Sequence, residues 1–188
     1  MPKKQNRPYG SWKSRITPQE IGTLPEFSEL HWAGDGCLLW LERSSHHTRL
    51  MSWDSHLEEI RNLSGEINVG GGIMYGGGSF TCCRDQIVFI EKSSQQLFWI
   101  PEKGSAPLPV PSSSHPKSSP RISPFGNIVV FVESDNNSRD RVQSLNLSGS
   151  QSSYTLDNRF DFYNYLRWHP DGRNLAWVSW NHPHMPWI

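Results

Sequence analysis

The sequence has no excess of charge of either sign. Its 188 residues include 18 Lys and Arg and 18 Asp and Glu, which gives a formal net charge of zero. Nucleic-acid-binding and membrane-surface proteins usually concentrate positive charge, so a balanced chain excludes the simplest form of either class. We therefore expect no nucleic-acid partner and no membrane partner.

Long hydrophobic runs are also missing. No apolar stretch approaches the length of a membrane-spanning helix, about 20 residues. The basic N-terminus, residues 1–8, is not followed by the apolar segment of a secretory signal, so we expect a cytoplasmic protein. The length suits one domain or part of a larger one, and it can enclose a hydrophobic core.

Cysteine is scarce. Cys37, Cys82 and Cys83 are the three cysteines, and they form no Cys-x-x-Cys pair. An odd number at this spacing argues against a disulfide framework and against a cysteine zinc site. We expect buried free thiols instead.

Aromatic residues, in contrast, are plentiful. The hydrophobic share is only 35%, yet 12% of the residues are aromatic and nine are Trp. Disordered chains are poor in aromatics, so compact apolar pieces must be present. We expect Trp40, Trp99 and Trp177 to pack in the core from within strands, and Trp32 and Trp168 to hold structural places just before turns.

These apolar pieces follow a repeat. Four times, a turn precedes a short β-branched and aromatic run. The runs span residues 37–42, 87–91, 128–133 and 175–180, and the turns before them end at residues 36, 86, 126 and 172. Repeats of about 40–50 residues with this content are typical of four-stranded propeller blades.

Other segments support an all-β fold. Residues 50–53, 96–100 and 141–147 look like returning strands behind polar hairpin links. The runs 87–90 and 128–132 are apolar throughout, as in strands that are buried on both faces. No amphipathic helix of sufficient length lies between strands, which argues against an α/β fold. We predict an all-β partial β-propeller of about three to four antiparallel blades, similar to WD and TolB propellers, whose ring is not closed.

Two regions are expected. Residues 1–30 form an N-terminal segment with a short helix, because Thr17-Pro18-Gln19-Glu20 combines an N-cap, a first-turn Pro and a capping-box Glu. Residues 31–188 form the incomplete propeller. Within it, the Pro- and Ser-rich residues 101–121 are expected to be an extended linker between blades.

A glycine cluster at residues 70–72 and 76–78 invites comparison with a phosphate loop. Such a loop needs a helix after the glycines and a Lys next to a Ser or Thr. Here Gly78 is followed by Ser79, Phe80 and a β run. We favour a close backbone approach or a bulge over nucleotide binding, and we expect no cofactor.

Catalytic and metal-binding patterns are weak as well. No Gly-x-Ser-x-Gly sequence occurs, so nothing points to a serine nucleophile in this chain. His46 and His47 are adjacent and point to opposite faces on a strand, which favours a hairpin turn over a metal site.

Two further polar pairs also give no indication of a metal or ligand site. His182 and His184 flank Pro183 without an acidic ligand beside them, which favours a structural loop. Glu58-Glu59 is expected to be a solvated pair. We assign no catalytic, cofactor-binding or metal-binding residue.

A succession of motifs nevertheless resembles a known family. In this order and over nearly the whole chain, the motifs resemble the N-terminal β-propeller of the prolyl oligopeptidase family of serine peptidases, on its acylaminoacyl-peptidase and dipeptidyl-peptidase-like branch. They are Pro8–Ser14 with Ile16-Thr17-Pro18, Tyr75–Gly78, Asp161-Phe162-Tyr163, Trp168–Trp177 and Trp180–Trp187. Two positions depart from the family: Ile73-Met74 stand where it usually has His-Glu, and Ile188 where it usually has Asp.

The resemblance implies a peptidase in which the propeller caps a following α/β-hydrolase domain with the Ser, Asp and His. The propeller would admit only short peptides to the enclosed site. Since this chain stops near the middle of such a propeller, we expect a truncated, non-catalytic portion and transfer no catalytic residue.

The partners then implied are the missing propeller half, the hydrolase domain and the peptide substrates of the parent enzyme. Self-association through open sheet edges is the other expectation. The alternative function is a free-standing half-propeller that binds a peptide or a protein.

Overall fold

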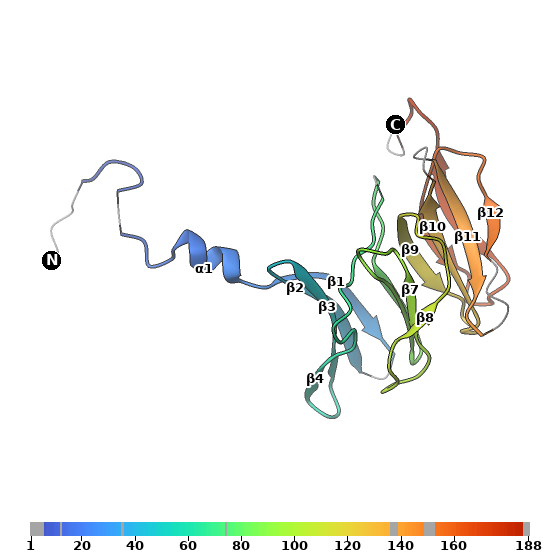
Figure 1. Cartoon of the computed structure of the whole chain (residues 1–188), viewed down its shortest axis with the longest axis horizontal. Helices are drawn as coiled ribbons and strands as arrows, with labels where there is room; N and C mark the ends of the chain where they lie inside the picture. Colours follow the sequence, from blue (N-terminus) through green and yellow to red (C-terminus); the bar gives the residue numbers. More distant parts are fainter. Residues whose placement is uncertain are drawn as a thin grey trace.

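The structure is a computed structural model that describes residues 6–11, 13–34, 36–73, 75–135, 139–148 and 153–185. Its strands form antiparallel sheets that succeed one another along the chain (Figure 1). Three sheets contain four strands each in chain order, and the last contains two. Each four-stranded meander has the topology of a propeller blade. The prediction of an all-β partial propeller is therefore confirmed, and the described sheets do not close a ring.

The bounds of the strands are as follows. The first sheet contains β1 (Glu26–Ala33), β2 (Cys37–Ser44), β3 (His47–Asp54) and β4 (Glu59–Asn62). The second contains β5 (Phe80–Cys83), β6 (Gln86–Ile90), β7 (Leu97–Ile100) and β8 (Leu108–Val110). The third contains β9 (Lys117–Ile122), β10 (Ile128–Ser134), β11 (Asp140–Asn146) and β12 (Tyr154–Asp157). The fourth contains β13 (Phe162–Trp168) and β14 (Leu175–Trp180).

The predicted repeat matches this order. The four apolar runs are β2, β6, β10 and β14, the second strand of every sheet. The predicted returning strands are β3, β7 and β11. Both sets are confirmed, and the continuously apolar β6 and β10 are buried on both faces, as expected. The first and fourth strands of the sheets were not predicted.

The expected linker at residues 101–121 contains strands. β8 completes the second sheet, and most of β9, which begins the third, also falls in this range. Lys117, Ser118 and Ser119 are at most 2% exposed. Proline is tolerated because both strands lie at the edges of their sheets, where one side of the backbone needs no ladder partner.

The N-terminal segment contains α1 (Pro18–Thr23), which stands apart from the sheets (Figure 1). The Glu20 amide donates to Thr17 Oγ1 at 3.2 Å, and the Thr17 amide donates to Glu20 Oε2 at 2.7 Å. The predicted capping box is thus confirmed. β1 already begins at Glu26, ahead of the expected boundary at residue 31. In the described part of the chain, no helix is long and apolar enough to cross a membrane.

Apolar clusters fill the spaces between successive sheets. Leu39, Leu50 and Phe89 belong to the cluster between the first and second sheets. Phe131 belongs to the cluster between the second and third sheets, and Tyr163 to the one between the third and fourth. Stacking of blades face to face is therefore the main source of the core.

The predicted places of the tryptophans hold only in part. Trp99, Trp168 and Trp177 pack against these clusters, as expected. Trp32, however, is 64% exposed, and Trp40 packs against none of the three. Both lie on the face of the first sheet that points away from the second, and no other sheet formed by the described residues packs on that face.

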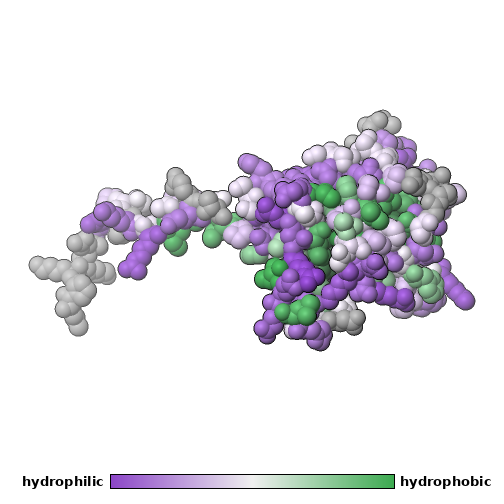
Figure 2. Space-filling view, turned by 60° about the horizontal axis from the view of Figure 1, so that its bottom comes forward, coloured by the Kyte–Doolittle hydropathy of each residue, from purple (hydrophilic) through white to green (hydrophobic). Residues whose placement is uncertain are grey.

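We call this apolar surface the outer face, and it consists of Trp32, Leu38, Trp53 and Ile60. These residues are paired across the four strands, so their side chains share one face. Ile60 is 62% exposed. Figure 2 shows apolar residues reaching the surface at the end of the molecule next to the N-terminal segment.

The three cysteines are free and half-buried. Cys37 and Cys82 pack against the cluster between the first two sheets, and Cys83 against the next. Burial raises the pKa of Cys82 to about 11. This thiol is therefore protonated and unreactive at neutral pH.

Candidate functional site

The glycine cluster forms a closely packed hairpin between β4 and β5. A Cβ atom on Gly77 would lie 2.1 Å from Ser118 Cβ, and one on Gly71 would lie 2.9 Å from the Lys117 carbonyl oxygen. The predicted close backbone approach is confirmed. The glycines are followed by β5 rather than by a helix, which gives no cradle for a phosphate.

The tip of this hairpin reaches the fourth sheet. The Tyr75 ring lies edge-on to Phe162, with centroids 4.6 Å apart, and 5.8 Å from Trp180. Asn164 Nδ2 donates to the Tyr75 carbonyl at 2.9 Å. Three of the sequence motifs, separated along the chain, therefore meet in one aromatic cluster.

His182 of the C-terminal motif packs against this cluster. The His182 ring lies edge-on to Phe162 at 4.8 Å, and the His182 amide donates to Asp161 Oδ2 at 3.1 Å. The structural-loop prediction is consistent with these contacts. Trp12, Met74, Pro186 and Trp187, which complete the family-like motifs, lie outside the described residues.

The remaining polar pairs lie in a hairpin turn and at the solvent-exposed surface, as the sequence predicts. His46 and His47 follow Ser45, whose φ of 56° makes the tight turn between β2 and β3. Glu59 accepts a hydrogen bond from Arg61 at 2.6 Å, which lowers the pKa of that carboxyl, and the pair is solvent-exposed. Among the residues that the structure describes, no group of three or more His, Cys, Asp or Glu side chains could hold a metal ion.

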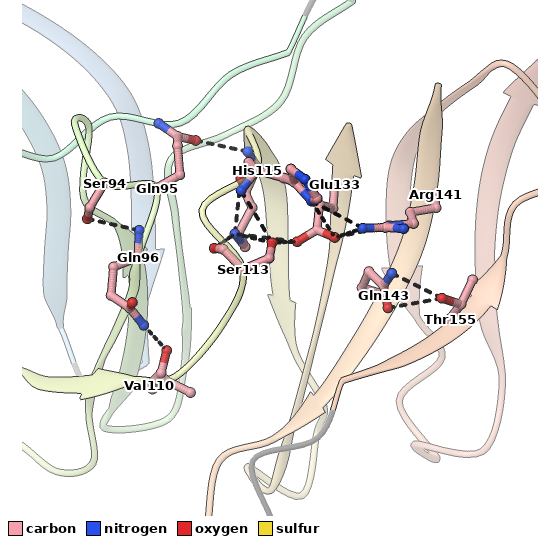
Figure 3. A network of polar contacts seen from close by, with 11 residues as sticks. Ser94, Gln95, Gln96, Val110, Ser113, His115, Glu133, Arg141, Gln143 and Thr155 are labelled. Atoms are coloured by element: carbon pink, nitrogen blue, oxygen red, sulfur yellow. Dashed lines mark hydrogen bonds and ion pairs between the residues drawn. The ribbon is translucent and has the colours of Figure 1, made fainter. Parts of the chain in front are cut away.

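A buried charge network holds residues 111–116 against the third sheet. Glu133 on β10 is 4% exposed and accepts from Arg141 at 2.5 Å and from Ser113, while the Lys117 ammonium lies 3.4 Å away (Figure 3). Burial opposes ionisation of Glu133, but the hydrogen bonds from Ser113 and Arg141 outweigh it and lower its pKa. Every charge in the network has a partner, which indicates a structural role.

A cavity of about 560 Å³ lies between the first and second sheets. Leu39, Ile87 and Ile100 are among the apolar side chains that line it. At its rim, Lys103 forms an ion pair with Asp54, and this hydrogen bond lowers the pKa of Asp54 to about 2. The volume suits a small molecule, but the charges at the rim neutralise each other. No sequence motif marked this cavity.

The first strands of the sheets form the inner side of the molecule. β1 contacts β5, β5 contacts β9, and β9 contacts β13. β1, β9 and β13 each carry a register shift relative to the second strand, typical of a β-bulge.

The bulges contain residues with positive φ. Glu29 (51°), Ser119 (53°) and Tyr165 (57°) adopt this conformation, which costs a non-glycine residue about 1–3 kcal/mol. The residue two positions further on is basic in all three strands: these are His31, Arg121 and Arg167. The sequence pattern gives no sign of these residues, because a bulge has no hydrophobic periodicity.

No protein-family model and no curated protein matches the sequence. A puromycin-hydrolyzing peptidase of Mycobacterium tuberculosis matches the structure with a TM-score of 0.80 and 25% identity, over 98% of this chain and 31% of the peptidase. A puromycin hydrolase matches with a TM-score of 0.78 and 22% identity, over 96% of this chain and 32% of that protein.

This chain resembles the propeller portion of prolyl oligopeptidase-family peptidases. The family resemblance seen in the sequence is thus confirmed, and the chain spans about a third of the length of these peptidases. TolB from Acinetobacter baumannii has the same fold, with a TM-score of 0.65 at 12% identity over 85% of this chain and 39% of TolB.

Proposed function

We propose that this chain is the non-catalytic propeller portion of a serine peptidase of the prolyl oligopeptidase family. In this role it limits by size the peptides that reach a hydrolase domain encoded with it. The observation that carries the proposal is the match of 98% of this chain to 31% of a peptidase. The ordered succession of family-like motifs, of which three meet around Tyr75, also supports it.

The partners of the chain are then the rest of the propeller, the hydrolase domain and short peptide substrates. Puromycin, in which an amide bond joins an amino acid to an amine, is a suitable first substrate. Two of the similar structures are named for the hydrolysis of puromycin. We also propose that the protein acts in the cytoplasm, which cell fractionation tests.

The size of the native gene product tests this proposal. An immunoblot of fractionated source cells, probed with antibody against residues 1–188, should show a cytoplasmic band much larger than 21.6 kDa. A band at 21.6 kDa would contradict it.

Activity gives a second test. The native protein should cleave puromycin and aminoacyl anilides, spare long polypeptides and lose its activity to a fluorophosphonate. The purified 188-residue chain should cleave none of them. Hydrolysis by this chain alone that is sensitive to fluorophosphonate would overturn the non-catalytic assignment.

A second candidate function is a free-standing half-propeller that binds a peptide or protein. The outer face favours it, because an apolar row across a whole sheet is suited to cover by another polypeptide. A stable native product of 21.6 kDa, recovered with a stoichiometric partner that residues 1–188 bind again after purification, would favour this alternative.

A further inference from the structure

Two arginines are held side by side on the inner side of the third and fourth sheets. Arg121 lies on β9 and Arg167 at the equivalent register position on β13. Trp168 Nε1 donates to the Arg121 carbonyl at 3.3 Å, and Ser119 Oγ donates to Asn164 Oδ1 at 3.3 Å. These hydrogen bonds fix the two strands against each other on both sides of the bulges.

Among the described residues, no carboxylate accepts a hydrogen bond from either guanidinium. Arg121 Nη1 donates to the Pro120 carbonyl at 2.6 Å, and Arg167 Nη1 to the Leu166 carbonyl at 3.0 Å. No ion pair of either residue is found within the described residues. Each guanidinium carries five N–H donors, so most of them remain available to a ligand.

The surroundings compensate the two positive charges only in part. Burial, followed by the charge of Arg167, lowers the pKa of Arg121, which shows that the two cations repel each other. Glu29 attracts Arg121 without a hydrogen bond to its guanidinium, because both Glu29 oxygens accept from Ser79 instead, at 2.6 and 2.8 Å. Burial and the charge of Arg121 lower the pKa of His31, so this histidine is neutral at pH 7 and adds no third charge.

We propose that Arg121 and Arg167 bind the C-terminal carboxylate of a short peptide on the inner side of the propeller. A carboxylate matches the planar fork of a guanidinium and would relieve the repulsion between the two cations. Tyr165, 61% exposed between Asn164 and Leu166, offers an aromatic surface to the adjoining side chain. The choice of a peptide as ligand rests on the proposed function, whereas the choice of a carboxylate rests on the arginine pair.

The bulges give a physical reason for this arrangement. A regular strand would place successive side chains alternately on the two faces of the sheet. An extra residue with positive φ re-aims the side chains that follow it, at a cost in stability. Both β9 and β13 contain such a residue with positive φ, and in each strand an arginine lies two positions after it.

Equilibrium dialysis of a tripeptide labelled at its N-terminus tests the proposal on the 188-residue chain. The peptide with a free C-terminus should bind about tenfold more tightly than the same peptide with an amidated C-terminus, the loss typical of one charge-assisted hydrogen bond. Arg121→Gln and Arg167→Gln should each remove this preference. Arg173→Gln, which removes an equal charge from an exposed turn of the fourth sheet, should retain it.

Three outcomes would overturn the proposal. They are equal binding of the free and amidated peptides, an equal loss with Arg173→Gln, and displacement of the peptide by inorganic phosphate at the same concentration as by the peptide itself. The last outcome would indicate a general anion site. If Arg121→Gln unfolds the chain, as judged by its melting curve, the exposed Arg167 supplies the decisive variant.

This result can be separated from that of the proposed function. A native product of 21.6 kDa would contradict the peptidase proposal and leave a measured carboxylate preference standing. A larger native product whose 188-residue portion shows no such preference would support the peptidase proposal and contradict carboxylate binding by Arg121 and Arg167.

Discussion

Asp140 is the residue whose burial most directly sets a pH dependence of stability. It is 5% exposed, and burial raises its pKa to about 6, although Ser134 and the Tyr163 amide donate hydrogen bonds to it. A folded-state pKa above the unfolded value of 3.8 means that the native chain keeps a proton that the unfolded chain releases. This contribution to stability is present below pH 4 and is lost as the pH rises through 6.

The variant Asp140→Asn should therefore be more stable than the parent chain at pH 7–8, by at most about 3 kcal/mol. The difference should shrink as the pH falls from 7 to 4.5, as measured by urea unfolding at each pH. Asp157→Asn is the control of opposite sign, since hydrogen bonding to Arg159 lowers the pKa of Asp157 to about 2. A gain from Asp140→Asn that does not change with pH would contradict this explanation.

Gly77 illustrates how a single missing side chain permits the contact between a hairpin and a strand. With φ at 122° and a Cβ position 2.1 Å from Ser118 Cβ, Gly77→Ala should cost about 2–3 kcal/mol in the free energy of unfolding. Gly72→Ala is the matched control, because φ is 148° there and nothing lies within 4 Å of the added atom. Equal losses in thermal melts of the two variants would show that backbone conformation, rather than the close approach, requires glycine.

At the scale of elements, the strands differ in how far the local sequence predicts their position. The second and third strands carry β-branched and aromatic runs, and these were predicted. β9 was not, because Lys117-Ser-Ser-Pro-Arg-Ile122 has no hydrophobic pattern, yet the strand is buried between neighbouring sheets. Its burial depends on Glu133, which neutralises Lys117, and on contacts with β5 and β13 that are distant in sequence.

The network around Glu133 leads to a prediction about the stability of the chain. Glu133→Gln should destabilise the chain by about 3 kcal/mol, because Lys117 is 0% exposed and would lose its counter-charge. The double variant Lys117→Met with Glu133→Leu should be less destabilised than Glu133→Gln alone.

Urea unfolding would compare these variants with Glu59→Gln, which breaks an exposed ion pair and should change stability by less than about 1 kcal/mol. A double variant that is as unstable as Glu133→Gln would show that packing, rather than the unpaired charge, causes the loss.

At the scale of the whole molecule, the first sheet has an exposed apolar face and the fourth sheet has an open edge. The outer face leaves Trp32 and Ile60 more than 60% exposed, and the fourth sheet contains two strands within the described residues. Exposed apolar faces and open strand edges promote association with other chains. We therefore expect the purified 188-residue chain to self-associate as its concentration rises.

Replacing Ile60 by Glu should weaken this self-association by at least about tenfold in sedimentation equilibrium, because a charge would be buried in the contact. Ile21→Glu is the matched control, since Ile21 is 60% exposed on α1, which stands apart from the sheets (Figure 1). A chain that is monomeric at all concentrations, or an equal effect of both variants, would contradict a role of the outer face.

The sequence by itself determined the fold class, the repeat, the family resemblance and the use of the glycines for a close approach. Each of these depends on local patterns, such as apolar runs, turn residues and missing side chains. Only the tertiary structure decided which polar segments became first strands and that Tyr75 reaches Phe162. It also decided that Arg121 and Arg167 lie together. The reason is physical: these positions follow from the packing of successive sheets and from bulges, and neither leaves a periodic trace along the chain.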